Sequence, residues 1–138
     1  LHKSAYSSIN SSWIIRMQRS RGVKIGQNCH ISPYVLIDLI YPGMISIGNN
    51  VTIGSNVMVF AHYNPTANAL LKESGYPREV KKVTINDGAV IGPGSIIIAG
   101  TTIGKNSIIG AGSVVSNEIP DCSVAIGNPA RVIKKIKF

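Results

Sequence analysis

Isoleucine or valine returns at every sixth position in the stretch Ile85-Asn-Asp-Gly-Ala-Val-Ile91-Gly-Pro-Gly-Ser-Ile-Ile97-Ile-Ala-Gly-Thr-Thr-Ile103-Gly-Lys-Asn-Ser-Ile-Ile109-Gly-Ala-Gly-Ser-Val-Val115. The same frame, extended along the chain, gives twelve units, led by Ile25, Ile31, Ile37, Ile47, Ile53, Val59, Ile85, Ile91, Ile97, Ile103, Ile109 and Val115. The chain has 34 Ile and Val residues but only 5 Leu. Because strands favour β-branched residues and helices favour Leu, Ala, Glu and Lys, the sequence predicts many short strands separated by turns.

Two further columns of the repeat support this interpretation. The fourth residue is Asn or Gly, which tolerate left-handed backbone, in eight of twelve units: Asn28, Asn50, Asn56, Gly88, Gly94, Gly100, Asn106 and Gly112. The fifth residue is small or β-branched in nine: Cys29, Val35, Val51, Val57, Ala89, Ser95, Thr101, Ser107 and Ser113. Three sides of six residues, each followed by a corner, close one coil around a narrow aliphatic core. The pattern therefore predicts an all-β fold, a parallel β-helix of about four coils.

Three breaks interrupt the frame. About four residues are inserted at 39–44, a longer excursion occupies about 64–82, and the frame slips at 117–120. A regular coil has no structural need for a long loop, and long loops on rigid scaffolds often carry function. We therefore expect the excursion to lie beside a functional site.

The chain of 138 residues suits one domain. We expect an N-terminal cap segment at 1–22 with a short helix over 12–20, a β-helix domain at 23–127 and a basic C-terminal tail at 128–138. No signal peptide pattern is visible and the apolar runs are too short to span a bilayer, so the sequence predicts no transmembrane helix and a cytoplasmic location.

The formal net charge of +8 raises the question of nucleic-acid binding. Aromatic residues are only 6% and are not interleaved with the basic residues, which gather in the excursion and the tail. An anionic cofactor explains the same charge, so no nucleic-acid partner is expected.

His62 occupies the fourth position of its unit, directly before the excursion. This position predicts a corner with left-handed backbone and a side chain that points out of the coil. Two interpretations stay open from the residues alone: a solvated surface histidine, or a general base. His2 and His30 form no obvious cluster with His62, so no metal site is expected, and Cys29 and Cys122 suggest neither a disulfide framework nor a nucleophile.

The chain resembles the hexapeptide-repeat acyltransferases, and within them the galactoside and maltose O-acetyltransferase branch. The resemblance covers about residues 23–138 and rests on the Ile-Gly hexapeptides, His62 before a long loop, the run from Ile109 to Val115 and the tail Gly127-Asn-Pro-Ala-Arg-Val-Ile-Lys134. It implies a left-handed β-helix and a homotrimer with active sites between neighbouring subunits. It also implies acetyl-CoA as co-substrate and no metal.

The resemblance assigns roles to individual residues. His62 matches the catalytic base, which would take a proton from an acceptor hydroxyl while backbone N–H groups hold the developing oxyanion. Ala111 and Ser116 match positions along the pantetheine arm. Arg131 and Lys134 match basic positions near the nucleotide phosphates, as suits an anionic ligand.

Two residues would contact the acceptor. Asp38 lies where the family often carries an acceptor-site acid, and Ser32 stands where the family carries an Asn. The resemblance implies an O-acetyltransferase that acts on a hydroxyl of a sugar or a polysaccharide precursor. An antibiotic-modifying (xenobiotic) acyltransferase and a non-catalytic β-helix scaffold are the alternatives.

Overall fold

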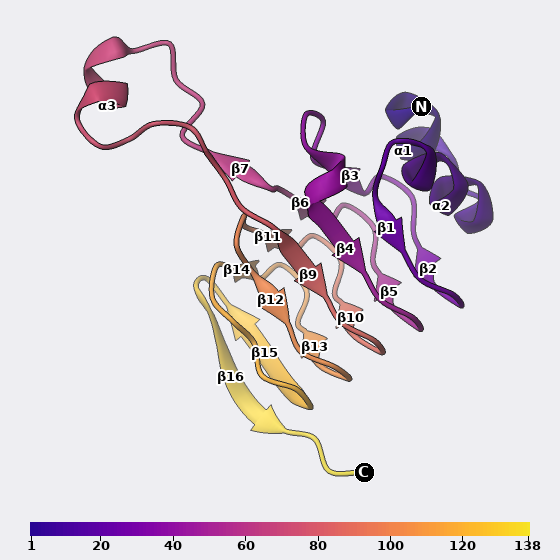
Figure 1. Cartoon of the computed structure of the whole chain (residues 1–138). Helices are drawn as coiled ribbons and strands as arrows, with labels where there is room; N and C mark the ends of the chain where they lie inside the picture. Colours follow the sequence, from indigo (N-terminus) through magenta and orange to yellow (C-terminus); the bar gives the residue numbers. More distant parts are fainter.

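The computed structural model describes all 138 residues, and three parallel sheets form the sides of a prism (Figure 1). Face A consists of β1 (Lys24–Ile25), β4 (Ile45–Ile47), β9 (Val83–Ile85) and β12 (Thr102–Ile103). Face B consists of β2 (His30–Ile31), β5 (Thr52–Ile53), β10 (Val90–Ile91), β13 (Ile108–Ile109), β15 (Ser123–Gly127) and β16 (Ala130–Lys135). Face C consists of β3 (Leu36–Ile37), β6 (Met58–Val59), β11 (Ile96–Ile97) and β14 (Val114–Val115). The chain visits the faces in the order A, B, C, so the predicted parallel β-helix is confirmed.

The register of the strands follows the six-residue frame. Ile85 pairs with Ile103, Ile91 with Ile109, and Ile97 with Val115, so residues eighteen apart stack on the same face of successive coils. The backbone hydrogen bonds of the strands run between coils, as in Gly92 N to Ile109 O at 2.8 Å. Each coil is therefore completed by its neighbours.

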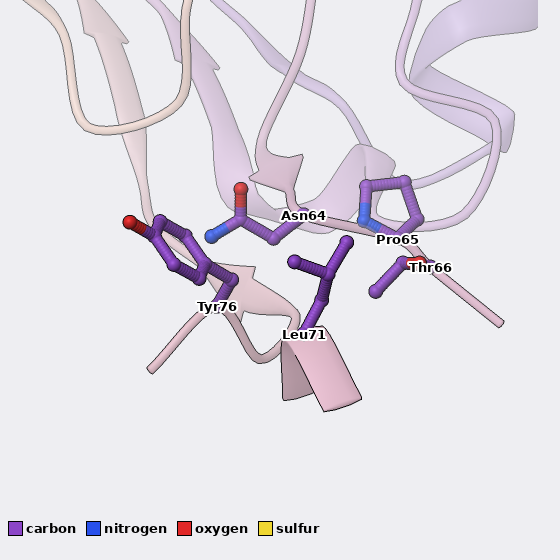
Figure 2. Close-up of a pocket in the computed structure, with 5 residues that line it drawn as sticks. All are labelled: Asn64, Pro65, Thr66, Leu71 and Tyr76. Atoms are coloured by element: carbon purple, nitrogen blue, oxygen red, sulfur yellow. The ribbon is translucent and has the colours of Figure 1, made fainter. Parts of the chain in front are cut away.

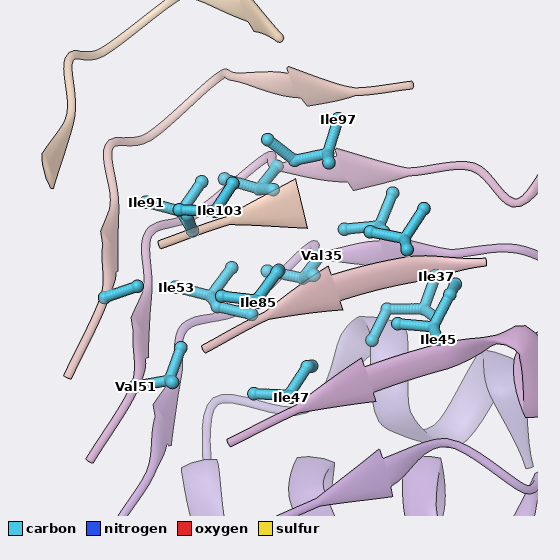
Figure 3. Close-up of a cluster of buried hydrophobic side chains, with 14 of the residues drawn as sticks. Val35, Ile37, Ile45, Ile47, Val51, Ile53, Ile85, Ile91, Ile97 and Ile103 are labelled. Carbon is cyan, nitrogen blue, oxygen red and sulfur yellow. The ribbon is translucent and has the colours of Figure 1, made fainter. Parts of the chain in front are cut away.

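The core is a column of aliphatic side chains inside the prism (Figure 3). Eleven of the twelve unit-leading residues are buried, and Ile25 in the first coil is partly buried and packs against the same cluster. The nine small or β-branched residues of the fifth position are buried as well, apart from the partly buried Cys29. Where they carry hydroxyls, these bond to backbone carbonyls, as in Thr101 Oγ1 to Val115 O at 3.0 Å. Burial of these polar side chains is thus compensated.

The corners show why the repeat needs Asn and Gly. All eight Asn and Gly residues of the fourth position have positive φ, from 54° at Asn106 to 88° at Gly100. The Gly in the Ile-Gly pairs has a different reason: a Cβ on Gly92 would lie 2.6 Å from the backbone N of Ala111 in the next coil. Coils can stack at strand spacing only if this side chain is absent.

The repeat continues beyond the point where the sequence pattern ends. After the slip, Ile119 bridges to Ile103 on face A, and Ala125 pairs with Ile109 on face B. Both side chains are buried, so they lead two further units six residues apart. The sequence frame missed them because the slip shifts the phase and because Ala125 is not β-branched.

Other elements cover the two ends of the prism (Figure 1). Helices α1 (His2–Ser7) and α2 (Ser11–Ser20) lie at the N-terminal end, where Ile14 and Ile15 of α2 join the core. At the other end β16 folds back antiparallel to β15. None of the helices has the length and apolar character needed to cross a membrane.

Both insertions leave the prism close to the edge between faces C and A. The first contains the short 3-10 helix η1 (Pro42–Met44). The excursion is a hairpin of β7 (His62–Tyr63) and β8 (Glu79–Val80) that carries α3 (Ala69–Glu73) at its tip. His62 is extended in β7, so the expectation of left-handed backbone there is wrong; the chain runs straight into the hairpin, and Asn64 has the positive φ, 59°.

Adjacent isoleucines on opposite sides of one strand test this core. Ile109 is 1% exposed in the core, whereas Ile108 is 39% exposed on the outside of face B. We expect Ile109→Ala to lower the free energy of unfolding by about 2–5 kcal/mol, because it removes buried methyl groups and leaves a cavity. Ile108→Ala should cost about 1 kcal/mol or less, the range of strand propensity. Denaturant titration of the two variants measures the difference, and equal losses would contradict the assigned core.

Candidate active site

His62 forms a hydrogen-bonded pair with Asp38 across the edge between faces C and A. His62 Nδ1 lies 2.6 Å from Asp38 Oδ2. Asp38 directly follows β3 and His62 begins β7, and these segments meet because Ile37 and Val59 are paired in register. The side chain of His62 is 13% exposed and that of Asp38 is 0% exposed, so the pair faces solvent only through the imidazole.

The carboxylate of Asp38 is fully bonded within the chain. Oδ1 accepts from the backbone N–H groups of Ile40 and Tyr41, both at 2.9 Å, and Oδ2 accepts from that of Ala61 at 2.7 Å. Burial alone would raise the pKa of Asp38, but the N–H groups of Tyr41, Ala61 and Ile40, together with His62, outweigh it and lower the pKa. Asp38 is therefore ionised at neutral pH.

This charge state fixes the roles of the two imidazole nitrogens. A carboxylate only accepts hydrogen bonds, so Nδ1 of His62 must be the donor. In the neutral ring Nε2 then carries the free lone pair. The pair presents one basic nitrogen to the solvent-facing side, as a general base requires.

Arg21, at the end of helix α2, secures the segment that carries Asp38. Its Nη2 donates to the carbonyl oxygens of Ile37 at 3.1 Å and Asp38 at 2.6 Å, and its Nη1 donates to Gln18 Oε1. The N-terminal helices are thus tied to the first coil directly beneath the candidate base.

Ser116 lies on the same prism edge as His62. Val59, Ile97 and Val115 stack in register on face C, so Ser116, which follows Val115, occupies the same edge two coils farther on. Two strand spacings of about 4.8 Å separate these coils by roughly 10 Å.

The structure places Ser32 and Ala111 on a different edge. Ser32 follows β2 and Ala111 lies just after β13, both on face B, so both are at the edge between faces B and C. Within one chain these two residues are separated from His62 by the width of face C. The sites expected from the sequence therefore form two groups.

Arg131 joins the second group through a β-bulge. On β16, Arg131 pairs with Ile126 and Lys134 with Val124, with an irregularity in register between Val124 and Ala125. Residues three apart on a regular strand point to opposite faces, but the bulge returns Arg131 and Lys134 to the same side. A cavity of about 600 Å³ opens there, lined by Ile108, Val124, Lys134, Lys135, Ile136 and Lys137.

A smaller cavity of about 210 Å³ lies within the excursion, where Asn64, Pro65, Thr66, Leu71 and Tyr76 surround it (Figure 2). Its lining comes from both arms of the hairpin and from α3. No group of three or more His, Cys, Asp and Glu side chains is arranged to hold a metal ion.

Sequence reasoning singled out Asp38 but not its partnership with His62. The resemblance implied contact with an acceptor, whereas the fully buried carboxylate has both oxygens occupied by the chain. The geometry favours a role in orienting His62. The sequence could have revealed the pair if the insertion at 39–44 had been left out of the repeat. Ile37 and Val59 then occupy equivalent positions in successive coils, which brings Asp38 close to His62.

Acid titration tests the environment of Asp38. Because folding lowers the pKa of Asp38 from 3.8, its contribution to stability is present above that value and is lost as the pH falls through the lower pKa of the folded state. We expect Asp38→Asn to be less stable than the parent at neutral pH and to lose less stability on acidification. Unfolding titrations at a series of pH values measure this, and parallel curves for both proteins would contradict the assignment.

Comparisons with known proteins agree with the fold and the repeat. The family described as bacterial transferase hexapeptide (six repeats) matches residues 82–117, and the hexapeptide repeat of succinyl-transferase matches residues 44–61. The galactoside O-acetyltransferase of Lactococcus lactis is 36% identical over 132 residues, covering 82% of this chain and 63% of the relative. The chain spans about half the length of two other curated relatives, 59% of one from Bacillus subtilis and 44% of one from Schizosaccharomyces pombe.

Two solved structures extend the likeness to nearly the whole chain. A maltose O-acetyltransferase from Clostridium difficile 630 superimposes with a TM-score of 0.72 at 31% identity, over 99% of this chain and 83% of that one. A galactoside acetyltransferase in complex with coenzyme A gives a TM-score of 0.71 at 29% identity, over 99% and 77%. These neighbours imply that the β-helix is left-handed. The chain belongs to the hexapeptide-repeat acyltransferase family, on the branch of the galactoside and maltose O-acetyltransferases.

Proposed function

We propose that this chain is an acetyl-CoA-dependent O-acetyltransferase that acts on a hydroxyl of a sugar or a polysaccharide precursor. The observation that carries the proposal is the hydrogen bond from His62 Nδ1 to the buried Asp38 carboxylate, which leaves Nε2 free as a base. Galactoside and maltose O-acetyltransferases among the relatives support a sugar as acceptor.

In the proposed reaction, Nε2 of His62 takes the proton of the acceptor hydroxyl as that oxygen attacks the thioester carbonyl. A carbon–oxygen bond forms and the carbon–sulfur bond breaks, so the acetyl group moves to the acceptor oxygen. The proton on Nε2 then passes to the departing thiolate. Asp38 stays ionised throughout and stabilises the imidazolium that exists between the two transfers.

The basic end of the prism fits the nucleotide part of coenzyme A. Arg131 and Lys134 project from the same side of β16, and Lys134 lines the large cavity together with Lys135 and Lys137. Guanidinium and ammonium groups pair with phosphate, and the aliphatic residues of the cavity offer an apolar surface beside them. A relative was solved with coenzyme A bound, which supports this use of the site.

The separation of the site residues supports a homotrimer. One prism edge carries His62 and Ser116 and the other carries Ala111 and Arg131, and face C lies between them. The outward side chains on the strands of face C are all apolar: Leu36, Met58, Ile96 and Val114. Those on the strands of face A are polar: Lys24, Ser46, Thr84 and Thr102. We infer that face C packs on the assembly axis. The two edges of neighbouring copies then meet and complete one site.

Replacement of His62 tests the activity. We expect His62→Ala to lower kcat for acetyl transfer by about 10²–10⁴-fold, the usual contribution of a general base, while coenzyme A binding and thermal stability persist. Release of free thiol measures turnover, and calorimetry measures binding. The matched control is His30→Ala, an exposed histidine on face B. Full activity in His62→Ala would refute His62 as the base, whereas a parent chain with no acetyl transfer would favour the scaffold alternative.

A charge placed on face C tests the assembly. Met58 is 40% exposed in the single chain. We expect Met58→Lys to convert trimers into monomers and to abolish activity, because the site would lose one of its two edges. Thr84→Lys adds the same charge to face A and should leave the trimer intact. Sedimentation measures both variants, and an active monomer of Met58→Lys would refute a site shared between copies.

A further inference from the structure

The two insertions that break the six-residue frame converge on His62. Tyr41 comes from the insertion at 39–44, and Arg78 comes from the excursion at 64–82, directly before β8. The segments are 37 residues apart in sequence, yet Arg78 Nη1 donates a long hydrogen bond of 3.4 Å to the hydroxyl of Tyr41. Neither residue is needed to close a coil.

Tyr41 touches both members of the His62–Asp38 pair. Its ring lies edge-on to the imidazole, with centroids 5.3 Å apart and planes at 66°. Its backbone N–H donates to Asp38 Oδ1 at 2.9 Å. The side chain is partly buried and packs against the hydrophobic core, which holds the ring in place. One residue thus fixes the carboxylate through its backbone and covers the imidazole through its ring.

Arg78 has no acidic partner within ion-pair distance; the ion pairs of the chain are His62–Asp38 and Lys81–Glu79. Its side chain donates to the Tyr41 hydroxyl, and this bond links the excursion to Tyr41. The excursion is otherwise joined to the prism near His62 by the β7–β8 pairing and by Lys81 N to Ala61 O at 2.9 Å.

We propose that Tyr41 is a positioning residue for His62: its ring fixes the orientation of the imidazole and shields the His62–Asp38 hydrogen bond from water, while the long hydrogen bond from Arg78 to its hydroxyl is an accessory contact. The inference rests on the proposed function for its kinetic consequence, but its geometric content is independent of the reaction. A single hydrogen bond still lets the imidazole tilt by some degrees about the Cβ–Cγ bond, and an edge contact on the ring restricts this motion. Displacement of a reacting group by about 1 Å can cost about 10²-fold in rate.

Kinetics of side-chain variants measure the effect on turnover. Tyr41→Ala keeps the backbone N–H that serves Asp38, so it removes only the ring. We expect kcat to fall by about 10- to 100-fold with the KM for acetyl-CoA unchanged, because the ring orients the base and does not bind the cofactor. Tyr41→Phe keeps the ring and should restore kcat to within about 3-fold of the parent. Arg78→Gln should have the same kcat as Tyr41→Phe. The double variant Tyr41→Phe/Arg78→Gln should have a kcat no lower than either single variant, because both substitutions remove the same hydrogen bond.

A spectroscopic measurement separates this inference from the proposed function. The chain has three histidines, so ¹⁵N-histidine labelling isolates the Nδ1 proton of His62, which we expect far downfield in the parent and absent in Asp38→Asn. In Tyr41→Ala the same signal should broaden or vanish through exchange with water. The matched control is Tyr6→Ala, which removes another edge-on ring, one that lies 5.7 Å from Tyr34.

The outcomes discriminate as follows. A lost proton signal together with a lowered kcat supports the inference. A lost signal in a protein with no acetyltransferase activity in any form supports the positioning role and refutes the proposed function. An unchanged signal in Tyr41→Ala overturns the inference whatever happens to kcat, since a lowered kcat would then mean that Tyr41 contacts the acceptor. Failure of Tyr41→Phe to restore kcat overturns the role given to the ring.

Discussion

The structure depends on a narrow core, which each side of a coil fills with one leading Ile or Val and one smaller fifth-position residue. This width sets the six-residue spacing, because a residue out of phase would point outward or meet the backbone of the next coil. The corners use Asn and Gly because they require positive φ, and Gly follows the leading Ile, as at Gly92, because the backbone of the next coil lies too close for a Cβ. The two insertions that break the frame leave the prism, at 39–44 and 64–82.

Both insertions leave the prism beside the edge between faces C and A, and the candidate active site lies at this edge. The regular coils offer mostly backbone and small side chains at their edges. The first insertion turns its backbone N–H groups toward Asp38, and the second begins at His62. The rigid prism therefore aligns the segments of successive coils, while the residues where the chain leaves the prism provide the ionised carboxylate and the imidazole.

Much of the fold could be predicted from the sequence because its periodicity is local. The leading residues, the left-handed corners and the positions of both insertions follow from the frame alone. The last two units could not be found, since Ile119 resumes the repeat in a shifted phase and Ala125 lacks a β-branched side chain. At the site, His62 stood out by its place in the frame, but its extended backbone and its bond to Asp38 arise from contacts between coils. The bulge that returns Arg131 and Lys134 to one side likewise comes from the pairing of β16 with β15.

Because His62 and Ser116 lie on one edge of the prism, the distance between them is set by the number of coils that separate them. Residues near the candidate acceptor end belong to the first two coils, and those near the candidate cofactor end belong to the last coil and the tail. The gap between them is a whole number of strand spacings of about 4.8 Å. Evolution could therefore lengthen or shorten the reach between the two ends in fixed steps, by gaining or losing eighteen residues, without disturbing the chemistry at either end.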